Sequence, residues 1–267
     1  MTVTAGARLS PEQVRTLEPA GLREAFRAGR WTEPTGGMAP GRLQANLVIL
    51  PRDEALEFLI FCQRNPKPCP LVGVTEPGVL EAPDAPGSDL RTDLPRYRVF
   101  TDGVVRDEPT DITAWWRPDL VGMLLGCSVT FEDALVSAGV PVRHLEAGQT
   151  CPMYVTSRRC VPVGRFHGPL VVTMRSIPAA LVPLAVEVTA RLPEAHGAPV
   201  QVGDPAQLGI DLDRPDFGDP PIVRPGDVPV FWACGVTPQL VCERSRPSLM
   251  VTHYPGCMFI TDRRADT

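Results

Sequence analysis

Lysine is almost absent from this chain, because Lys67 is the only lysine among 26 lysine and arginine residues. Lys67 lies between two prolines, so the chain has no glycine-lysine pair of the kind that a phosphate-binding loop requires. A Schiff-base enzyme would depend on this single residue, which argues against that class of chemistry. The cations are therefore almost all arginines, which bind carboxylates through two parallel hydrogen bonds.

Long apolar runs and a basic excess are also missing. No run approaches the ~20 apolar residues of a membrane-spanning helix, and residues 1–14 lack the basic start and apolar core of a signal peptide. The net charge of −5 argues against a nucleic-acid partner. We therefore predict a globular cytoplasmic protein without a membrane or nucleic-acid partner, and a homodimer is the default prediction for its oligomeric state.

The cysteines do not have the spacing of a metal site. The chain has eight of them, no two separated by only two residues, and no dinucleotide-binding glycine fingerprint. A disulfide framework is typical of short exported chains, which this is not. The sequence thus predicts no metal, no cofactor and mostly buried thiols, with Cys62 and Cys242 as core residues on helices.

Apolar strand-like segments alternate with helical patterns near both ends of the chain. Ser10 is placed to cap a helix over 11–27, and we predict strands at 46–50, 170–174, 199–202, 228–232 and 249–252 and helices at 54–63, 178–192 and 238–245. Continuous apolar strands followed by helices indicate an α/β fold, with a mostly parallel sheet covered by helices.

The middle of the chain has a different pattern. Asp102-Gly103 predicts a hairpin turn, helical patterns follow at 119–125 and 130–138, and short strands are expected at 140–145 and 153–156. We interpret 77–163 as a smaller α+β subdomain inserted into a main α/β domain made of 1–76 and 164–267. No internal repeat is apparent, and the proline-rich segments 77–95 and 211–229 are expected to be loops.

Eight segments spread over the chain resemble one family. They are Gln44-Ala-Asn-Leu-Val-Ile-Leu-Pro51, Phe61-Cys-Gln-Arg-Asn-Pro-Lys-Pro-Cys-Pro70, Gly126-Cys-Ser-Val-Thr-Phe-Glu132, Cys151-Pro-Met-Tyr154, Val172-Thr-Met-Arg175, Gly203-Asp-Pro205, Trp232-Ala-Cys-Gly-Val-Thr-Pro-Gln239 and Thr252-His-Tyr-Pro-Gly256. In this order they resemble the hydro-lyase family that includes D-glutamate cyclase. The resemblance implies a two-part α/β fold and a lyase that makes or breaks water, such as one interconverting D-glutamate and 5-oxo-D-proline.

The chain departs from the pattern of that family at a few positions. Thr150-Cys151 stands where Asn-Val is usual, Val155 replaces an arginine, and Cys257 replaces a histidine. These departures are consistent with a changed substrate. They leave two alternatives open: a catalytically silent small-carboxylate-binding protein, and a lactam or amide hydrolase of a specialised pathway.

Removal of water from a small amino or hydroxy acid requires a carboxylate clamp, a base, and a donor to the developing oxyanion. The carboxyl ends of strands and the family-like segments supply the candidates. Catalytic candidates are Cys127, Ser128, Cys234 and His253. Candidates for substrate binding are Arg52, Arg64, Tyr154, Arg175, Asp204, Gly235, Thr237 and Gln239.

Each candidate also has a structural interpretation. Either cysteine can be a packed core thiol, His253 a hydrogen-bonded core histidine, and Ser128 a helix cap. Tyr154 can be core packing, Asp204 a turn residue, Arg64 a surface charge, and Arg175 the partner of a structural carboxylate. We expect Thr237 to cap a helix whose first residue is Pro238, so that the free N–H groups of this helix bind the substrate carboxylate.

Overall fold

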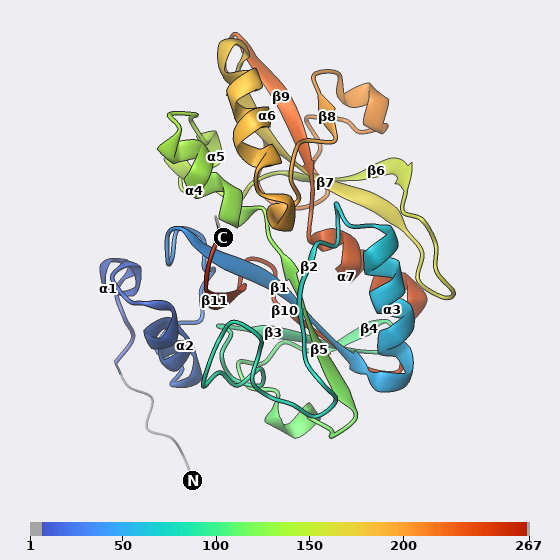
Figure 1. Cartoon of the computed structure of the whole chain (residues 1–267). Coiled ribbons are helices and arrows are strands. Elements are labelled where there is room, and N and C mark those ends of the chain that lie inside the picture. The colour runs from blue at the N-terminus through green and yellow to red at the C-terminus, as the bar shows by residue number, and fades with distance from the viewer. Residues whose placement is uncertain (1–6, 266–267) are drawn as a thin grey trace.

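Two β-sheets form the framework of the protein (Figure 1). The computed structural model describes residues 7–265. The first six residues of segment 1–14, for which the sequence predicts no signal peptide, lie outside this range. The larger sheet has the order β2 (Leu71–Val74), β5 (Leu120–Gly126), β1 (Arg42–Pro51), β10 (Met250–His253), β3 (Tyr97–Thr101) and β4 (Val104–Asp107), and β11 (Phe259–Arg264) pairs with β1. The smaller sheet has the order β6 (Met153–Arg159), β7 (Pro169–Pro178), β9 (Asp227–Ala233) and β8 (Gln201–Val202).

The α-helices are short and lie around and between the sheets (Figure 1). They are α1 (Pro11–Arg15), α2 (Pro19–Arg27), α3 (Arg52–Arg64), α4 (Val129–Ser137), α5 (Arg143–Glu146), α6 (Val182–Ala190) and α7 (Val236–Ser245). Ser10 caps α1 as predicted, but the helix expected over 11–27 is two helices. Within 7–265, no helix combines the length and the apolar character that crossing a membrane requires.

The predicted mostly parallel sheet is wrong, although the broader α/β class is correct. Every strand pairing in the described part of the chain is antiparallel. In β1, Leu47 and Ile49 pack into one apolar cluster and Val48 and Leu50 into another. The strand is apolar throughout because both of its faces are buried, and burial on both faces says nothing about the direction of its neighbours.

Two short elements differ in type from their predictions. The segment predicted as a helix at 119–125 is β5, a fully buried strand between β1 and β2. The segment predicted as a strand at 140–145 contains the start of α5. Periodicity cannot distinguish a buried strand from a buried helical turn when the apolar run is this short.

The hairpin in the middle of the chain is confirmed. Strands β3 and β4 flank Asp102 and Gly103, whose φ angles of 52° and 76° are those of a type I′ turn. The predicted domain boundaries do not follow the two sheets. Strands β3, β5 and β6 lie in the predicted insertion. They pair with β10, β1 and β7, respectively, which lie in the predicted main domain. Each sheet thus combines strands from both predicted domains, and the division into two domains stays a prediction.

A repeated unit relates the two sheets, although the sequence shows no obvious repeat. In the first unit β1 pairs with β5 from Ala45 opposite Gly126 to Pro51 opposite Leu120. In the second, β7 pairs with β9 from Val172 opposite Ala233 to Pro178 opposite Asp227. Both registers span seven residue pairs, both first strands end in proline, and both second strands lead into a helix, α4 or α7.

The match between the units extends to individual hydrogen bonds. Thr130, at the start of α4, accepts the N–H of Gln44 at 3.1 Å and donates to the carbonyl of the same residue at 3.5 Å. Thr237 in α7 does the same with Val171, at 3.0 and 3.3 Å. The clearest trace in the sequence is Cys-Ser-Val-Thr at 127–130 against Cys-Gly-Val-Thr at 234–237. The expectation of no internal repeat is therefore corrected.

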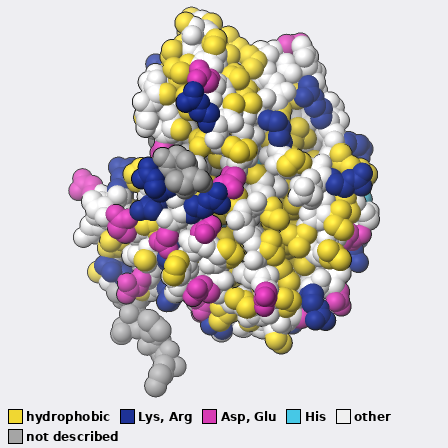
Figure 2. Space-filling view, viewed as in Figure 1, with side chains coloured by type: hydrophobic (Ala, Val, Ile, Leu, Met, Phe, Trp, Pro, Cys, Tyr) yellow, Lys and Arg dark blue, Asp and Glu magenta, His cyan; other side chains and the backbone are white. Residues whose placement is uncertain are grey.

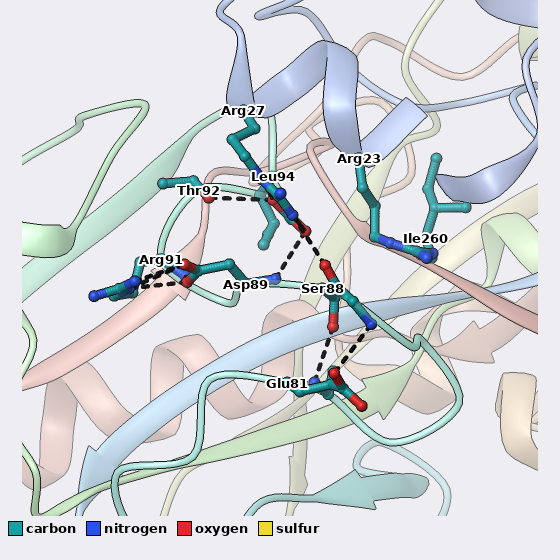
Figure 3. A network of polar contacts seen from close by, with 12 residues as sticks. Arg23, Arg27, Glu81, Ser88, Asp89, Arg91, Thr92, Leu94 and Ile260 are labelled. Atoms are coloured by element: carbon teal, nitrogen blue, oxygen red, sulfur yellow. Dashed lines mark hydrogen bonds and ion pairs between the residues drawn. The ribbon is translucent and has the colours of Figure 1, made fainter. Parts of the chain in front are cut away.

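The proline-rich segment 77–95 is held against α2 by an ion pair between Arg27 and Asp93 (Figure 3). Asp93 is fully buried and accepts hydrogen bonds from Nε and Nη2 of Arg27 at 2.8 and 2.7 Å. It also accepts the N–H of Asp89, whose own carboxylate binds Arg91. This segment is thus a well-connected loop outside the space between the sheets. On the face shown in Figure 2, basic and acidic side chains are interspersed.

Candidate active site between the two sheets

The starts of α4 and α7 make reciprocal contacts across the two units. Gly235, which precedes α7, lies so close to Asn46 of β1 that an added Cβ would be 2.2 Å from Nδ2 of that residue. Ser128, the matching residue before α4, accepts a 3.4 Å hydrogen bond from Arg175 of β7. Each helix start therefore touches the first strand of the other unit. The two contacts differ in position, because Asn46 directly follows Ala45 of the first register whereas Arg175 lies three residues after Val172 of the second.

Arg175 and Glu132 form a buried ion pair beside the start of α4. The Arg175 guanidinium donates through Nε to Oε1 of Glu132 at 2.9 Å, and Nη2 contacts the same oxygen. Its Nη1 donates to Thr173 at 2.6 Å. Burial opposes the charge of Glu132, but the charge of Arg175 and a hydrogen bond from His144 hold the pKa of its carboxyl below the usual value. Both members of the pair are therefore charged at neutral pH.

His144 and Cys151 complete this polar cluster. Nε2 of His144 lies 3.0 Å from Oε1 of Glu132, and the ligand atoms of Glu132, His144 and Cys151 all lie within 4.8 Å of one another. Glutamate, histidine and cysteine are suitable zinc ligands. Here, however, the Arg175 guanidinium already occupies the same carboxylate oxygen, and its positive charge disfavours a cation at this place.

Cys127 and Cys234 have matching environments at the two helix starts. The sulfur of Cys127 accepts the N–H of Val129, and that of Cys234 accepts the N–H of Val236. Burial raises the pKa of Cys127 to about 11 and raises the pKa of Cys234 further, while these N–H groups and the charge of Arg175 act in the opposite direction. Both thiols are buried, and Cys234 is close enough to Cys127 for the charge of one to raise the pKa of the other.

His253 and Gln239 lie next to each other on the α7 side of the site. Nδ1 of His253 accepts the N–H of Leu47 at 3.2 Å, and Nε2 of Gln239 lies 3.4 Å from Nε2 of the ring. Burial lowers the pKa of His253 to about 4. The ring is therefore neutral at physiological pH.

The predicted capping role of Thr237 is wrong. The residue before α7 is Gly235, with φ −64° and no side-chain cap, and Thr237 lies inside the helix. Both hydrogen bonds of its hydroxyl go to the backbone of Val171, as described above. Gly235 is needed for space rather than for an unusual backbone angle, because Asn46 fills the position of a side chain.

Four of the predicted binding residues lie apart from this cluster. Arg52 is 69% exposed at the other end of β1 and pairs with Asp53, and Arg64 is exposed at the end of α3. Tyr154 donates to the carbonyl of Leu212 at 2.8 Å, and Asp204 accepts the N–H of Ala206 as a turn residue does. The expected common edge requires parallel strands, and the antiparallel pairing disperses these residues.

The remaining seven predicted residues, Cys127, Ser128, Arg175, Cys234, Gly235, Gln239 and His253, lie in or directly beside the cluster. Sequence reasoning missed Asn46, Glu132, His144, Cys151 and Thr173. The Cys-Ser-Val-Thr and Cys-Gly-Val-Thr repeat could have revealed Glu132, because it is the counterpart of Gln239, five residues after the cysteine in both units. His144 has no such signal.

A small pocket lies beside the start of α7. It has a volume of about 70 Å³ and is lined by Arg98, Met153, Phe217, Val236, Gln239, Leu240, Glu243 and Pro255. Gln239 thus contributes to both the pocket and the cluster around His253. The pocket therefore adjoins the α7 side of the site.

Comparisons with known proteins point to one family. A family model described as D-glutamate cyclase matches residues 121–262. A protein of Stutzerimonas stutzeri named "Putative hydro-lyase" is 57% identical over 252 residues, which are 94% of this chain and 95% of that protein. A Geobacillus kaustophilus protein with the same description is 57% identical over 244 residues, 91% of this chain and 93% of its own.

Among solved structures, a nitrogen repressor-like protein from Methanococcus jannaschii covers 87% of this chain with 91% of its own length. Its TM-score is 0.39 and its sequence identity 11%. A likeness this weak supports no statement about fold or function.

Proposed function

This chain belongs to the family of hydro-lyases whose model is described as D-glutamate cyclase, and from this membership we propose its reaction. It is a cofactor-independent carbon–oxygen lyase that acts on a small amino or hydroxy carboxylic acid. The reference reaction is the cyclisation of D-glutamate to 5-oxo-D-proline with loss of water, or its reverse. The acting site is the cluster between the two sheets.

The observation that carries this proposal is the meeting of two helix starts beside one buried cation. Helices α4 and α7 each direct a positive dipole end toward their first residues, where the first N–H groups already bond to atoms of Cys127, Ser128 or Cys234. Arg175 lies between them and contacts Ser128. The positive ends of the two helices favour a bound carboxylate and, in the transition state, an oxyanion, while Glu132 offsets the charge of Arg175.

Arg175 supports this site through its charge and its position rather than as a direct clamp. Its five hydrogen bonds all go to protein acceptors, on Ser128, Glu132, Thr173 and Met174. A guanidinium has five N–H donors, so none is left over for a substrate. The substrate carboxylate is therefore held by the positive dipole ends of α4 and α7, with Gln239 beside it.

The thiols and His253 are the proton carriers in this proposal. In cyclisation the α-amine attacks the γ-carboxyl carbon, a base takes a proton from the amine, and an acid donates to the leaving oxygen. Cys127, Cys234 and neutral His253 can serve these steps without a metal. A small carboxylate is the only ligand the reaction requires, and free thiols at all eight cysteines suit the cytoplasm that we propose as its location.

The test is direct incubation of the purified protein with candidate acids. D-glutamate, 5-oxo-D-proline, their L-forms and small 2- and 3-hydroxy acids are each followed by mass spectrometry for gain or loss of one water. We expect turnover of at least one acid, undiminished after dialysis against a chelator. Turnover of none, with binding detected by calorimetry, would favour the silent carboxylate-binding alternative, and amide hydrolysis without dehydration would favour the hydrolase.

Matched cysteine variants then locate the site. Cys127→Ala and Cys234→Ala should each reduce turnover by about 10²-fold or more, the usual contribution of one acid or base. Cys242→Ala is the control, because Cys242 lies on α7 but packs in an apolar cluster away from the polar residues. If both active-site variants keep wild-type turnover, the proposed site is wrong.

A further inference from the structure

The pocket beside α7 contains one cation and one anion that the proposed function does not use. Half of its lining comes from one face of α7, at helical spacing: Val236, Gln239, Leu240 and Glu243. Arg98 reaches it from β3 of the larger sheet, and Met153 from β6 of the smaller one. The pocket is therefore built where the two sheets meet, and its charged side chains, Arg98 and Glu243, come from different elements.

Glu243 brings to the pocket a carboxylate without a counter-ion. Its side chain is half-buried, and burial raises the pKa of its carboxyl, while the charges of Arg98 and Arg244 act in the opposite direction. Within the described part of the chain, neither arginine nor any other basic group forms an ion pair or hydrogen bond with it. A partly desolvated charge without a partner is unfavourable, so a cationic group of a ligand would be stabilised beside it.

Arg98 brings a guanidinium that is held in place but keeps unused donors. Its Nε and Nη2 lie 2.8 and 2.7 Å from Oε1 of Glu108, and its Cζ lies 5.1 Å from the centre of the Tyr254 ring. Among residues 7–265 no acceptor bonds to Nη1, so two N–H groups remain for a carboxylate. Arg96 shares both Glu108 and Tyr254, so the two arginines carry one positive charge more than Glu108 offsets.

Gln239 connects the pocket to the buried cluster. Its Nε2 donates to the carbonyl of His253 at 3.3 Å, and no described residue donates to its Oε1. The pocket volume of about 70 Å³ has room for a few water-sized groups. It therefore fits the charged end of a small acid, with the rest of the molecule extending past Gln239.

We propose that this pocket is the subsite for the head group of an α-amino acid, in which Arg98 binds the carboxylate and Glu243 binds the ammonium group. The second carboxylate of an acid such as glutamate then reaches the positive ends of α4 and α7. A hydroxy acid has the carboxylate but not the ammonium group, so the subsite selects amino acids over hydroxy acids. This inference rests on the proposed function, because it uses the same site, and it decides between the two substrate classes that the function allows.

Loss of either charge of the ligand leaves one side chain of the pocket unpaired. A hydroxy acid would displace water from Glu243 without supplying a cation, and an amine without an α-carboxylate would do the same to Arg98. A site that binds a polar group of its ligand rejects an analogue without that group more strongly than an apolar pocket rejects a missing methylene. We therefore expect the discrimination to be visible as a difference in affinity.

Isothermal titration calorimetry of the wild-type protein measures this difference. The probes are D- and L-glutamate, D- and L-2-hydroxyglutarate, glutarate and 4-aminobutyrate. One enantiomer of glutamate should bind about 10²-fold or more tightly than the matching hydroxy acid and than the two truncated acids. Equal affinity for glutamate and 2-hydroxyglutarate would refute the subsite.

Variants then test the two charged residues. Glu243→Gln keeps the shape of the side chain and has no ion pair to lose, so the protein should fold. Its affinity for glutamate should fall by about 10²-fold, while its affinity for 2-hydroxyglutarate stays unchanged. Arg98→Met should weaken the binding of both acids. Arg96→Met is the matched control, because Arg96 also contacts Glu108 and Tyr254 but does not line the pocket. If Glu243→Gln keeps the full preference for glutamate, the subsite is refuted.

The same protein samples, assayed for gain or loss of water, separate this inference from the proposed function. Turnover of an acid without preference for the ammonium group would refute the subsite and leave the proposed function standing. The preference without turnover of any acid would support the subsite and remove the proposed function. Neither binding nor turnover of any acid would overturn both.

Discussion

The unit of β5 and α4 and the unit of β9 and α7 share a backbone plan but differ in charge. Both place a cysteine after the strand, a valine N–H on its sulfur, and a threonine that bridges to a neighbouring strand. Five residues after the cysteine the first unit has Glu132, bonded to Arg175, and the second has Gln239, beside neutral His253. The duplicated backbone positions two equivalent thiols, while the side chains make one half of the site charged and the other neutral.

The largest expected difference between the two units is in the stability lost when Glu132 or Gln239, five residues after each cysteine, is replaced. Glu132→Gln leaves the buried Arg175 guanidinium without its counter-ion, and we expect a loss of about 3–5 kcal/mol in the free energy of unfolding. Gln239→Ala removes only neutral contacts and should cost about 1 kcal/mol. Urea denaturation of both variants checks this. Equal losses would show that the Glu132–Arg175 ion pair stabilises the protein no more than the neutral contacts of Gln239 do.

Acid should lower the free energy of unfolding through His253, which lies beside Gln239 of the second unit. Its pKa is about 4 in the folded protein against an ordinary value of 6.5, so the unfolded chain binds more protons between these values. Stability is therefore full above pH 6.5 and is lost as pH falls toward 4, by about 3 kcal/mol from this residue.

Urea denaturation at pH 7 and pH 4.5 measures the size of this loss. His253→Asn is the comparison, because His196 has a similarly lowered pKa and remains in both proteins. A wild-type loss no greater than that of the variant would contradict the prediction for His253.

Substitution by alanine should affect the starts of α4 and α7 differently. Gly235→Ala places a carbon against the Asn46 side chain, and we expect a loss of about 1–3 kcal/mol together with loss of turnover. Ser128→Ala at the matching position removes atoms instead and should change stability by less. Gly36→Ala is the control, since a Cβ there meets nothing within 4 Å. Thermal melts and turnover of the three variants test the asymmetry.

The smallest expected difference is between the two bridging threonines. Thr130→Val and Thr237→Val each leave a backbone N–H of the neighbouring strand, at Gln44 or Val171, without its partner. Both should therefore lose about 1–2 kcal/mol, by the same mechanism. Their denaturation midpoints should shift alike. A large shift in one and none in the other would show that the duplication does not extend to these bonds.

Local chemistry was enough to predict several elements. Asp102-Gly103 specifies its turn because both residues tolerate positive φ, and Ser10 caps α1 through neighbouring atoms only. Cys62 and Cys242 are core residues on helices, as predicted from the helical patterns around them. The family resemblance is also confirmed, because it depends on many short segments that are read directly from the sequence.

Contacts between distant segments decided the rest. The sequence by itself determined that β1 is a buried strand, that helices follow β1 and β9, and which family the chain belongs to. Only the tertiary structure decided that all described strand pairs are antiparallel, that 120–126 is a strand, and that Glu132 meets Arg175. The reason is that apolar patterns report burial, whereas strand direction and the meeting of two helix starts depend on pairings between residues far apart in the chain.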